Sequence, residues 1–353
     1  MSGQSIEDEF ATIVSEDEAD YDAIQETGVR EVAIHLTQKC NLGCTACYAL
    51  PVKDALAKEL NLSDLRWIEK TFKPEKVTLL GGEPLLYENI EEAFQIFNNV
   101  TISTNGYFLP KKIDMLKDYN VKVQISIEGR QEYNDGIRGQ GSFERAIQAG
   151  KIAKENGLTC YFRAGYCDKN LDDIEWLLDN ISGQMKIPLA LLPRMEEPPL
   201  DVQNQIWLFD KITSSKTGSL VALPHFWQYL GKHGRCNASS QRINVTYEGR
   251  ITPCHMIWNY TLGQIGDDLS IINISRKRFI EAHKRIPNDC MFCPKAEVCK
   301  GGCLVTPTYQ GCPLKMNFTI RAYVRAHGDE INVKELKNKI EIITNLVKDA
   351  GIC

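Results

Sequence analysis

Apolar residues along this chain gather in short runs that are separated by helix-length segments of mixed charge. Runs of about four to eight residues rich in Val, Ile and Leu predict buried β-strands, and the charged segments between them predict helices. The predicted strands are Val32–Leu36, Val77–Leu80, Val100–Ser103, Val121–Ile127, Leu158–Gly165 and Ile187–Leu192. The predicted helices are Leu62–Phe72, Ile90–Phe97, Lys111–Leu116, Ser142–Glu155 and Asp172–Leu178, with Ser142 as the N-cap of the fourth.

Six alternations of strand and helix indicate an α/β fold with a parallel sheet and right-handed crossovers. Eight such units would close a barrel, so six predict an open, partial (β/α)6 barrel of the TIM type, with its chemistry at the carboxyl ends of the strands. We expect five regions in chain order. They are an acidic N-terminal segment (1–30), the partial barrel (31–200), a linker with helical character (201–235), a small cysteine-rich domain (236–315) and a C-terminal helix (316–353).

Composition and charge narrow the class of protein. Hydrophobic residues make up 43% of the 353 and charged residues 25%, which is ordinary for a globular protein. A net charge of −5 argues against a nucleic-acid partner, and the apolar runs are too short to predict a membrane span. The N-terminus is acidic and lacks the order of a signal peptide, so we expect a cytoplasmic protein.

Thirteen cysteines need a chemical explanation. An odd number in a reducing compartment favours metal or cluster ligation over disulfides. An early group, Cys40, Cys44 and Cys47, directly follows the first predicted strand. Three thiolates can bind three irons of a [4Fe–4S] cluster and leave the fourth iron open to a chelating ligand. The alternative is an incomplete zinc site, although structural zinc takes four ligands.

Short segments with glycine and polar residues end the next three predicted strands. They are Gly81-Gly82-Glu83-Pro84, Ser103-Thr104-Asn105-Gly106 and Ser126-Ile127-Glu128-Gly129, the last followed by Asn134, Asp135 and Arg138. Backbone at a glycine turn can approach a ligand closely, and a nearby acid can accept a hydrogen bond from an ammonium group. The alternative for the first segment is an ordinary glycine turn before a helix.

The cysteine spacing, the aromatic residue after it and the GGEP segment together resemble the signature of the radical S-adenosylmethionine (SAM) superfamily. The resemblance implies that the early cysteines hold a SAM-binding [4Fe–4S] cluster. It also implies a set of residues that contact SAM: Tyr48, Gly81, Gly82, Glu83, Pro84, Ser103, Asn105, Ser126 and Arg138. Ser126 and Arg138 have the separation of a cofactor-contacting pair in the sulfatase-maturing branch, and Glu128 replaces the usual Asp.

A late group of seven cysteines resembles the SPASM domain, which carries two auxiliary [4Fe–4S] clusters. The resemblance implies one cluster on Cys236, Cys254 and Cys303, and another on Cys290, Cys293, Cys299 and Cys312, so that the chain holds three clusters. Seven ligands leave one iron without a cysteine, and we expect that iron to be open. Two structural zinc sites are the alternative. This segment has few long apolar runs, so we expect bound metal to supply its stability.

The implied activity is that of a radical SAM/SPASM maturase. It would cleave SAM to a 5′-deoxyadenosyl radical that abstracts hydrogen from a side chain of a ribosomal peptide or protein, with ferredoxin or flavodoxin as the electron donor. His255 stands where sulfatase maturases carry a catalytic Asp, and it is either a proton acceptor or a surface histidine. Radical modification of a small molecule, such as a tetrapyrrole or sugar, is a second interpretation. A non-catalytic iron–sulfur or zinc-binding protein is a third, which would have no use for a cofactor pocket.

Overall fold

The computed structural model describes residues 28–47, 49, 57–194, 197, 200, 204, 207–208, 211, 221–222 and 238–283. These residues fall into two compact units. The sheet unit comprises the described residues from 28 to 163 and from 238 to 283, and the second unit comprises those from 164 to 222. Tyr48, Cys236 and the cysteines from Cys290 onward lie outside the described residues, as does the predicted C-terminal helix.

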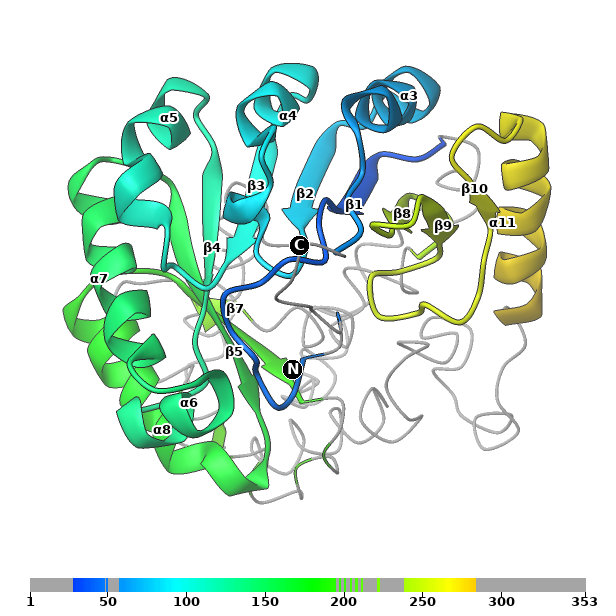
Figure 1. Cartoon of the computed structure of the whole chain (residues 1–353). Coiled ribbons are helices and arrows are strands. Elements are labelled where there is room, and N and C mark those ends of the chain that lie inside the picture. Colours follow the sequence, from blue (N-terminus) through cyan, green and yellow to red (C-terminus); the bar gives the residue numbers. More distant parts are fainter. Residues whose placement is uncertain are drawn as a thin grey trace, which may run out of the picture. The chain divides into compact units, whose positions relative to one another are not determined.

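Parallel strands form the centre of the sheet unit (Figure 1). In chain order they are β1 (Glu31–His35), β2 (Lys76–Leu80), β3 (Val100–Thr104), β4 (Lys122–Ser126) and β5 (Cys160–Tyr166), whose last residues belong to the second unit. β1 pairs with β2 on one side, and β8 (Arg242–Val245) pairs in parallel with its other side. The antiparallel strands β9 (Arg250–Thr252) and β10 (Gly263–Gln264) complete the order β10-β9-β8-β1-β2-β3-β4-β5.

Helices follow the strands as the sequence predicts. The sheet unit contains α3 (Leu62–Phe72), η1 (Pro84–Leu86), α4 (Ile90–Ile96), η2 (Leu109–Lys112), α5 (Ile113–Asp118), α6 (Gln131–Arg138), α7 (Ser142–Glu155) and α11 (Leu269–His283). The second unit contains η3 (Asp168–Asn170), α8 (Leu171–Leu177), η4 (Leu178–Gln184) and the parallel pair β6 (Leu189–Pro193) and β7 (Val221–Ala222). The six predicted strands and the five predicted helices between Leu62 and Leu178 are confirmed, with ends shifted by at most two residues. Within the described part of the chain, no helix is long and apolar enough to cross a bilayer.

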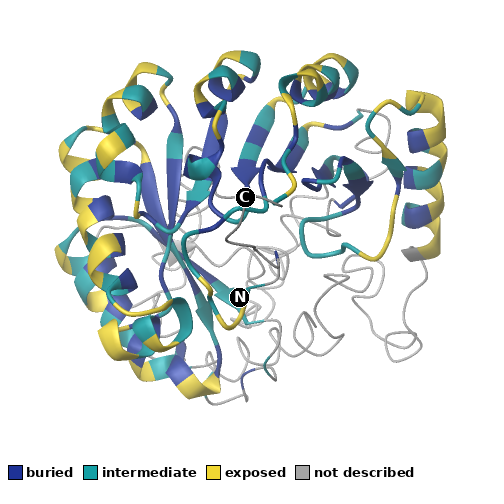
Figure 2. Cartoon of the chain, in the orientation of Figure 1, coloured by how far each residue is buried: buried dark blue, intermediate teal, exposed yellow. Residues whose placement is uncertain are grey.

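The two faces of the central sheet differ in chemistry. Paired residues share a face and successive residues alternate, so the register assigns each side chain to a face. One face is aliphatic and buried: Val32, Ile34, Val77, Leu79, Val100, Ile102, Val123, Ile125, Phe162, Ile243 and Val245. Helices α3, α4, α5 and α7 lie along one side of these strands (Figure 1), and their apolar stripes require an apolar partner. Figure 2 shows the resulting contrast between buried strands and outward-facing, exposed helix surfaces.

The opposite face of the same sheet is polar. It carries Glu31, His35, Lys76, Thr101, Ser103, Gln124, Ser126, Tyr161, Arg163, Arg242, Asn244 and Thr252. Hydrogen bonds link neighbouring strands across it. Gln124 Nε2 donates to Ser103 Oγ at 2.7 Å, and Tyr161 Oη donates to Gln124 Oε1 at 3.0 Å. A sheet that is aliphatic on the helix side and polar on the other is suited to enclose a polar ligand.

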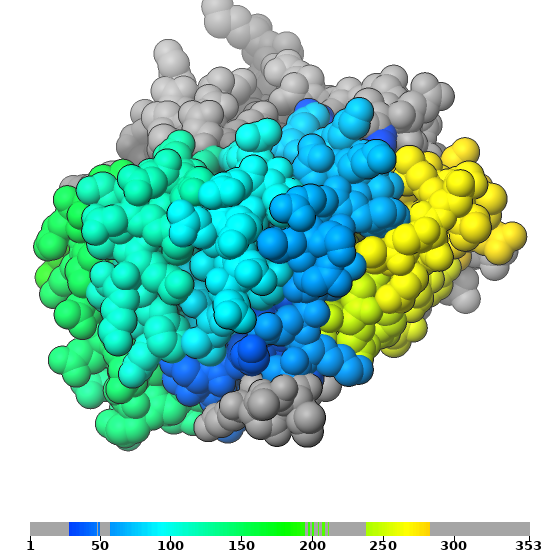
Figure 3. All heavy atoms as spheres, turned by 45° about the horizontal axis from the view of Figure 1, so that its top comes forward, coloured from blue at the N-terminus to red at the C-terminus, as the bar shows by residue number. Residues whose placement is uncertain are grey.

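The segment 238–283 is held by the sheet. Its strand residues Ile243, Val245 and Ile251 are fully buried. Arg276 of α11 donates to the carbonyl oxygens of Ser239 and Ser240 at 2.8 and 2.6 Å. Figure 3 shows this segment against the one that contains α3. The described part of the cysteine-rich region is therefore stabilised by strand pairing and burial.

Helix α7 begins at Ser142 itself, so the prediction of Ser142 as its N-cap is wrong. Gly141 occupies that position with a φ of 74°, and Asp135 of α6 supplies the capping carboxylate. Its oxygens accept hydrogen bonds from the backbone N–H groups of Gly141 and Phe143, each at 2.8 Å, and from Ser142 Oγ at 3.0 Å. A cap contributed by the preceding helix ties α6 to α7.

Replacing this cap is expected to destabilise the sheet unit. Although burial by itself raises the pKa of Asp135, the bonds from Phe143, Gly141 and Ser142 lower it. Its contribution to stability is therefore present above the unfolded pKa of about 3.9 and is lost as the pH falls through the lowered folded value. We expect Asp135→Ala to cost about 1 kcal/mol of unfolding free energy at pH 7, measured with urea. Asp118→Ala, at an exposed position of α5, is the control, and an equal cost for both would contradict the capping role.

Candidate active site at the carboxyl edge of the sheet

The early cysteines lie on the loop that follows β1, and neighbouring loops hold that loop by its backbone. The carbonyl oxygens of Thr37 and Lys39 accept hydrogen bonds from the N–H groups of Gly82 and Glu83, at 2.7 and 2.8 Å. On the other side, the N–H of Thr45 donates to the carbonyl oxygen of Ile137 in α6 at 3.0 Å. The cysteine loop is thus fixed between the end of β2 and the helix that follows β4.

Gly81 and Gly82 are required by this close approach. A Cβ atom on Gly82 would lie 2.3 Å from the carbonyl oxygen of Lys39, and one on Gly81 would lie 2.8 Å from that of Thr37. Both distances are shorter than a carbon–oxygen contact allows, and the atoms in the way are backbone. From the sequence we expected these glycines to let a ligand approach the backbone. In the described structure they let the backbone of the cysteine loop approach instead.

Glu83 is buried, with 1% of its surface exposed, directly below this loop. Its Oε1 accepts from Thr104 Oγ1 at 2.7 Å and from the N–H of Leu85 at 3.2 Å, and its Oε2 accepts from the N–H of Asn105 at 2.9 Å. Burial raises the pKa of Glu83 to about 7 despite these bonds. The carboxyl group joins the ends of β2 and β3, and Oε2 retains the capacity to accept a further donor.

The segment Ser103-Thr104-Asn105-Gly106, at the end of β3, connects to the cysteine loop through side chains. Asn105 Nδ2 donates to the Oδ1 of Asn41, between the first two cysteines, at 2.9 Å, and Asn105 Oδ1 accepts from the N–H of Tyr107 at 3.0 Å. Ser103 lies on the polar face, where it accepts from Gln124. Pro84 begins η1, where its missing N–H is not needed. Among these predicted contact residues, Asn105 therefore also positions the loop.

The stretch from the end of β4 through α6 brings the cation of Arg138 next to the cysteines. Arg138, the last residue of α6, donates from Nε and Nη2 to Oε1 of Glu128, at 3.0 and 2.5 Å. Burial raises the pKa of Cys44, and the charge of Arg138 opposes part of that rise. Ser126 is partly buried at the end of β4 on the polar face. The motif residues predicted from four separate stretches of sequence thus meet at one edge of the sheet.

The environment of the thiols is compatible with a thiolate-bound cluster. Burial raises the pKa of Cys40 to about 11, while its sulfur accepts a hydrogen bond from the N–H of Leu42 at 3.4 Å. A thiolate at this position would therefore need stabilisation by a bound metal. Among the described residues, no three His, Cys, Asp or Glu side chains converge on the position of a single ion. Three cysteines that each bind a different iron of a cluster do not need to converge.

Only Cys254 of the late group lies within the described residues. It follows β9, and its Sγ lies 3.8 Å from Nδ1 of His255. Burial and the charges of Arg163 and Arg242 lower the pKa of His255 well below its usual value. The imidazole is consequently neutral near pH 7, able to accept a proton but weakly basic.

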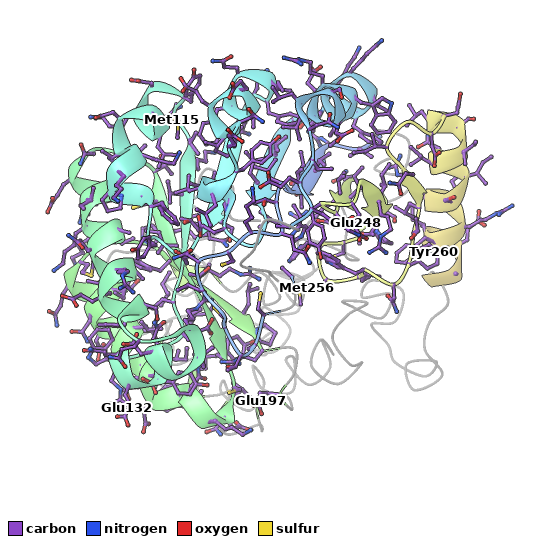
Figure 4. The ribbon with its side chains drawn as sticks, in the orientation of Figure 1. Met115, Glu132, Glu197, Glu248, Met256 and Tyr260 are labelled. Atoms are coloured by element: carbon purple, nitrogen blue, oxygen red, sulfur yellow. The ribbon has the colours of Figure 1, made fainter. Side chains whose placement is uncertain are left out.

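Aromatic residues after β8 were not predicted as part of the site. Tyr247 is buried in the turn after β8, where burial and the charge of Glu248 raise its pKa and the nearby sulfur of Cys47 raises it further by a smaller amount. Its ring lies 5.4 Å from that of Trp258, which in turn lies 4.9 Å from the ring of His35. The same turn carries Glu248, labelled in Figure 4, which pairs with Lys58 from the loop after β1. No motif in the sequence indicates this proximity, because it depends on the pairing of β8 with β1.

Comparison with known proteins identifies the domain. Residues 34–181 match the family model of the radical SAM superfamily. The sporulation killing factor maturation protein SkfB of Bacillus subtilis (strain 168) is 30% identical over 162 residues, which are 42% of this chain and 39% of that protein. Fe-coproporphyrin III synthase of Methanosarcina barkeri (strain Fusaro / DSM 804) is 28% identical over 167 residues, 44% of this chain and 42% of that protein. The chain spans about two fifths of the length of these relatives.

A solved structure has the same fold. The crystal structure of Streptococcus suis SuiB bound to precursor peptide SuiA has a TM-score of 0.66 and 19% identity, and the likeness covers 79% of this chain and 72% of that one. At this identity the likeness is one of fold. Residues 34–181, the part of the chain that carries the cysteine loop and the other motifs, are therefore similar to the radical SAM superfamily.

Proposed function

We propose that this chain reductively cleaves SAM and uses the resulting 5′-deoxyadenosyl radical to abstract hydrogen from a side chain of a ribosomal peptide or protein. The observation that carries the proposal is the meeting of the cysteine loop, Glu83 and Arg138 at the carboxyl edge of β1–β4. When bound there, a [4Fe–4S] cluster supplies the electron that breaks the sulfonium bond of SAM. The residues around it bind and orient SAM.

Each residue has a role that suits its environment. Cys40, Cys44 and Cys47 are the cluster ligands. Glu83 Oε2 accepts a hydrogen bond from the amino group of SAM, whose positive charge offsets the burial that disfavours the carboxylate. The guanidinium of Arg138 binds the carboxylate of SAM, which its planar donors match. Gly82 and Asn105 hold the cysteine loop in position beside Glu83 and Arg138.

The polar face of the sheet is the proposed position of the substrate. It lies on the side away from the helices, and its side chains extend from the same strands that end at the cysteine loop. His255 lies beside Cys254 and remains the candidate to accept the proton after hydrogen abstraction, although its lowered pKa makes it a weak base. The two auxiliary clusters and the ferredoxin or flavodoxin donor stay predictions from the sequence.

The proposal predicts iron content and cofactor cleavage together. Protein reconstituted anaerobically should bind about twelve irons, enough for three [4Fe–4S] clusters on ten thiolates. With dithionite and SAM it should release 5′-deoxyadenosine, measured by liquid chromatography. Protein that binds stoichiometric zinc, takes up no iron and forms no 5′-deoxyadenosine would contradict both parts.

A tetrapyrrole substrate is the second candidate, favoured by the 28% identity to Fe-coproporphyrin III synthase. We expect SAM cleavage to accelerate when the true substrate occupies the site. We would compare the rate of 5′-deoxyadenosine formation with peptides encoded next to this gene, with porphyrin-type tetrapyrrole precursors, and with neither. Acceleration and a mass change with a peptide support the first proposal, and acceleration with the porphyrin alone would replace it.

A further inference from the structure

The side chain of Glu128 holds the guanidinium of Arg138 in one orientation. A single oxygen, Oε1, accepts both from Nε and from Nη2, and the two side chains are 12% and 19% exposed. A partly buried pair of this kind has little freedom, because separating it would leave a buried charge without a partner. The orientation of Arg138 is therefore set by the position of Glu128.

Glu128 is itself fixed by a buried neighbour. Its backbone N–H donates to Oδ1 of Asn134 at 2.9 Å, and Nδ2 of Asn134 donates to Oγ of Ser142 at 2.9 Å. Asn134 is fully buried and lies one turn before Arg138 on α6. The end of β4, α6 and the start of α7 thus form one frame around the ion pair.

A guanidinium has two edges that can each bind a carboxylate: the side edge, Nε and one Nη, and the end edge, Nη1 and Nη2. Glu128 occupies the side edge. The described residues place no hydrogen-bond acceptor against Nη1, so the end edge is the one that a ligand carboxylate can meet. Arg138 also lies within electrostatic range of Cys44 and Cys47.

We propose that Glu128 is a positioning residue, which presents the end edge of Arg138 to the carboxylate of SAM beside the cysteine loop. This inference rests on the proposed function, because it takes SAM as the ligand. Glu128 itself does not touch SAM. Its effect passes through Arg138, so that removing Glu128 should matter only when Arg138 and the ligand carboxylate are both present.

The test measures SAM binding to anaerobically reconstituted protein by isothermal titration calorimetry, alongside iron content and thermal midpoint. We expect Glu128→Ala to weaken SAM binding by about tenfold or more, and Glu128→Gln, which keeps an oxygen acceptor but not the charge, to weaken it less. Glu132→Ala is the matched control, since Glu132 is exposed on the outer side of the same helix (Figure 4). It should bind SAM as the parent does.

Two further measurements separate positioning from general structural support. Decarboxylated SAM lacks the group that Arg138 binds, so Glu128→Ala should leave its affinity unchanged. In an Arg138→Ala background, adding Glu128→Ala should weaken SAM binding no further. The inference would be overturned if Glu128→Ala bound SAM and decarboxylated SAM more weakly by the same factor. Loss of iron in this variant, or SAM binding as tight as in the parent, would also overturn it. Failure of the parent to bind SAM would instead refute the proposed function.

Discussion

Replacing all three early cysteines, Cys40→Ala, Cys44→Ala and Cys47→Ala, should abolish the formation of 5′-deoxyadenosine. No electron can reach SAM if the cluster that binds it has no ligands. The expected loss is complete within the sensitivity of liquid chromatography, which makes it the largest effect predicted here. The loop itself should stay in place, because its hydrogen bonds to Gly82, Glu83 and Ile137 involve no cysteine side chain.

Iron measurements distinguish loss of one cluster from collapse of the protein. The variant should lose about four irons and keep the iron assigned to the late cysteines. Cys160→Ala is the matched control, since this buried thiol lies on β5 and has no predicted ligand role. Residual SAM cleavage in the triple variant would show that the cluster is bound elsewhere.

Gly82→Ala should have the second-largest effect, although it adds only one methyl group. The new Cβ would meet the carbonyl oxygen of Lys39 at 2.3 Å, and neither backbone can yield without breaking the hydrogen bonds between the GGEP segment and the cysteine loop. We expect at least a tenfold loss of SAM-dependent 5′-deoxyadenosine formation and incomplete loading of the first cluster, measured by iron content. The displaced loop would no longer hold its thiols at the required spacing.

Gly136→Ala provides the contrast for this substitution. Gly136 lies within α6, and a Cβ atom there would meet nothing within 4 Å. Alanine favours the helical conformation over glycine by about 1 kcal/mol, so this variant should be as stable as the parent or more so, with unchanged iron loading. Equal loading of Gly82→Ala and the parent would contradict the close approach as the reason for glycine.

The sequence predicted the core of the sheet unit well because the pattern there is local. Buried parallel strands appear as aliphatic runs, so β1 to β6 were found, and the helices between them were found except α6 after β4. The four motifs were found because each directly follows one of these strands, and parallel strands bring their carboxyl ends to one edge. The location of the site could therefore be predicted from the position of each motif directly after a strand.

What the sequence did not reveal depends on contacts between distant segments. Strand β8 pairs with β1 across more than 200 residues of chain, and its four residues carry no distinctive pattern. Helix α11 was missed because Ile271 and Ile274 are exposed, so its apolar residues do not mark a single face. The pairing of Glu128 with Arg138 was missed because both were assigned to motifs separately, and only the geometry shows that they touch.

The division of the sheet into an aliphatic and a polar face also bears on how such an enzyme can evolve. Alternation along each strand interleaves positions that determine folding with positions that face the proposed substrate. Selection for a new substrate can therefore exchange Gln124, Tyr161 or Asn244 while Val123, Phe162 and Val245 remain under selection for stability. Divergence in specificity need not erode the scaffold, and a library restricted to the polar face would be a rational starting point for redirecting the radical.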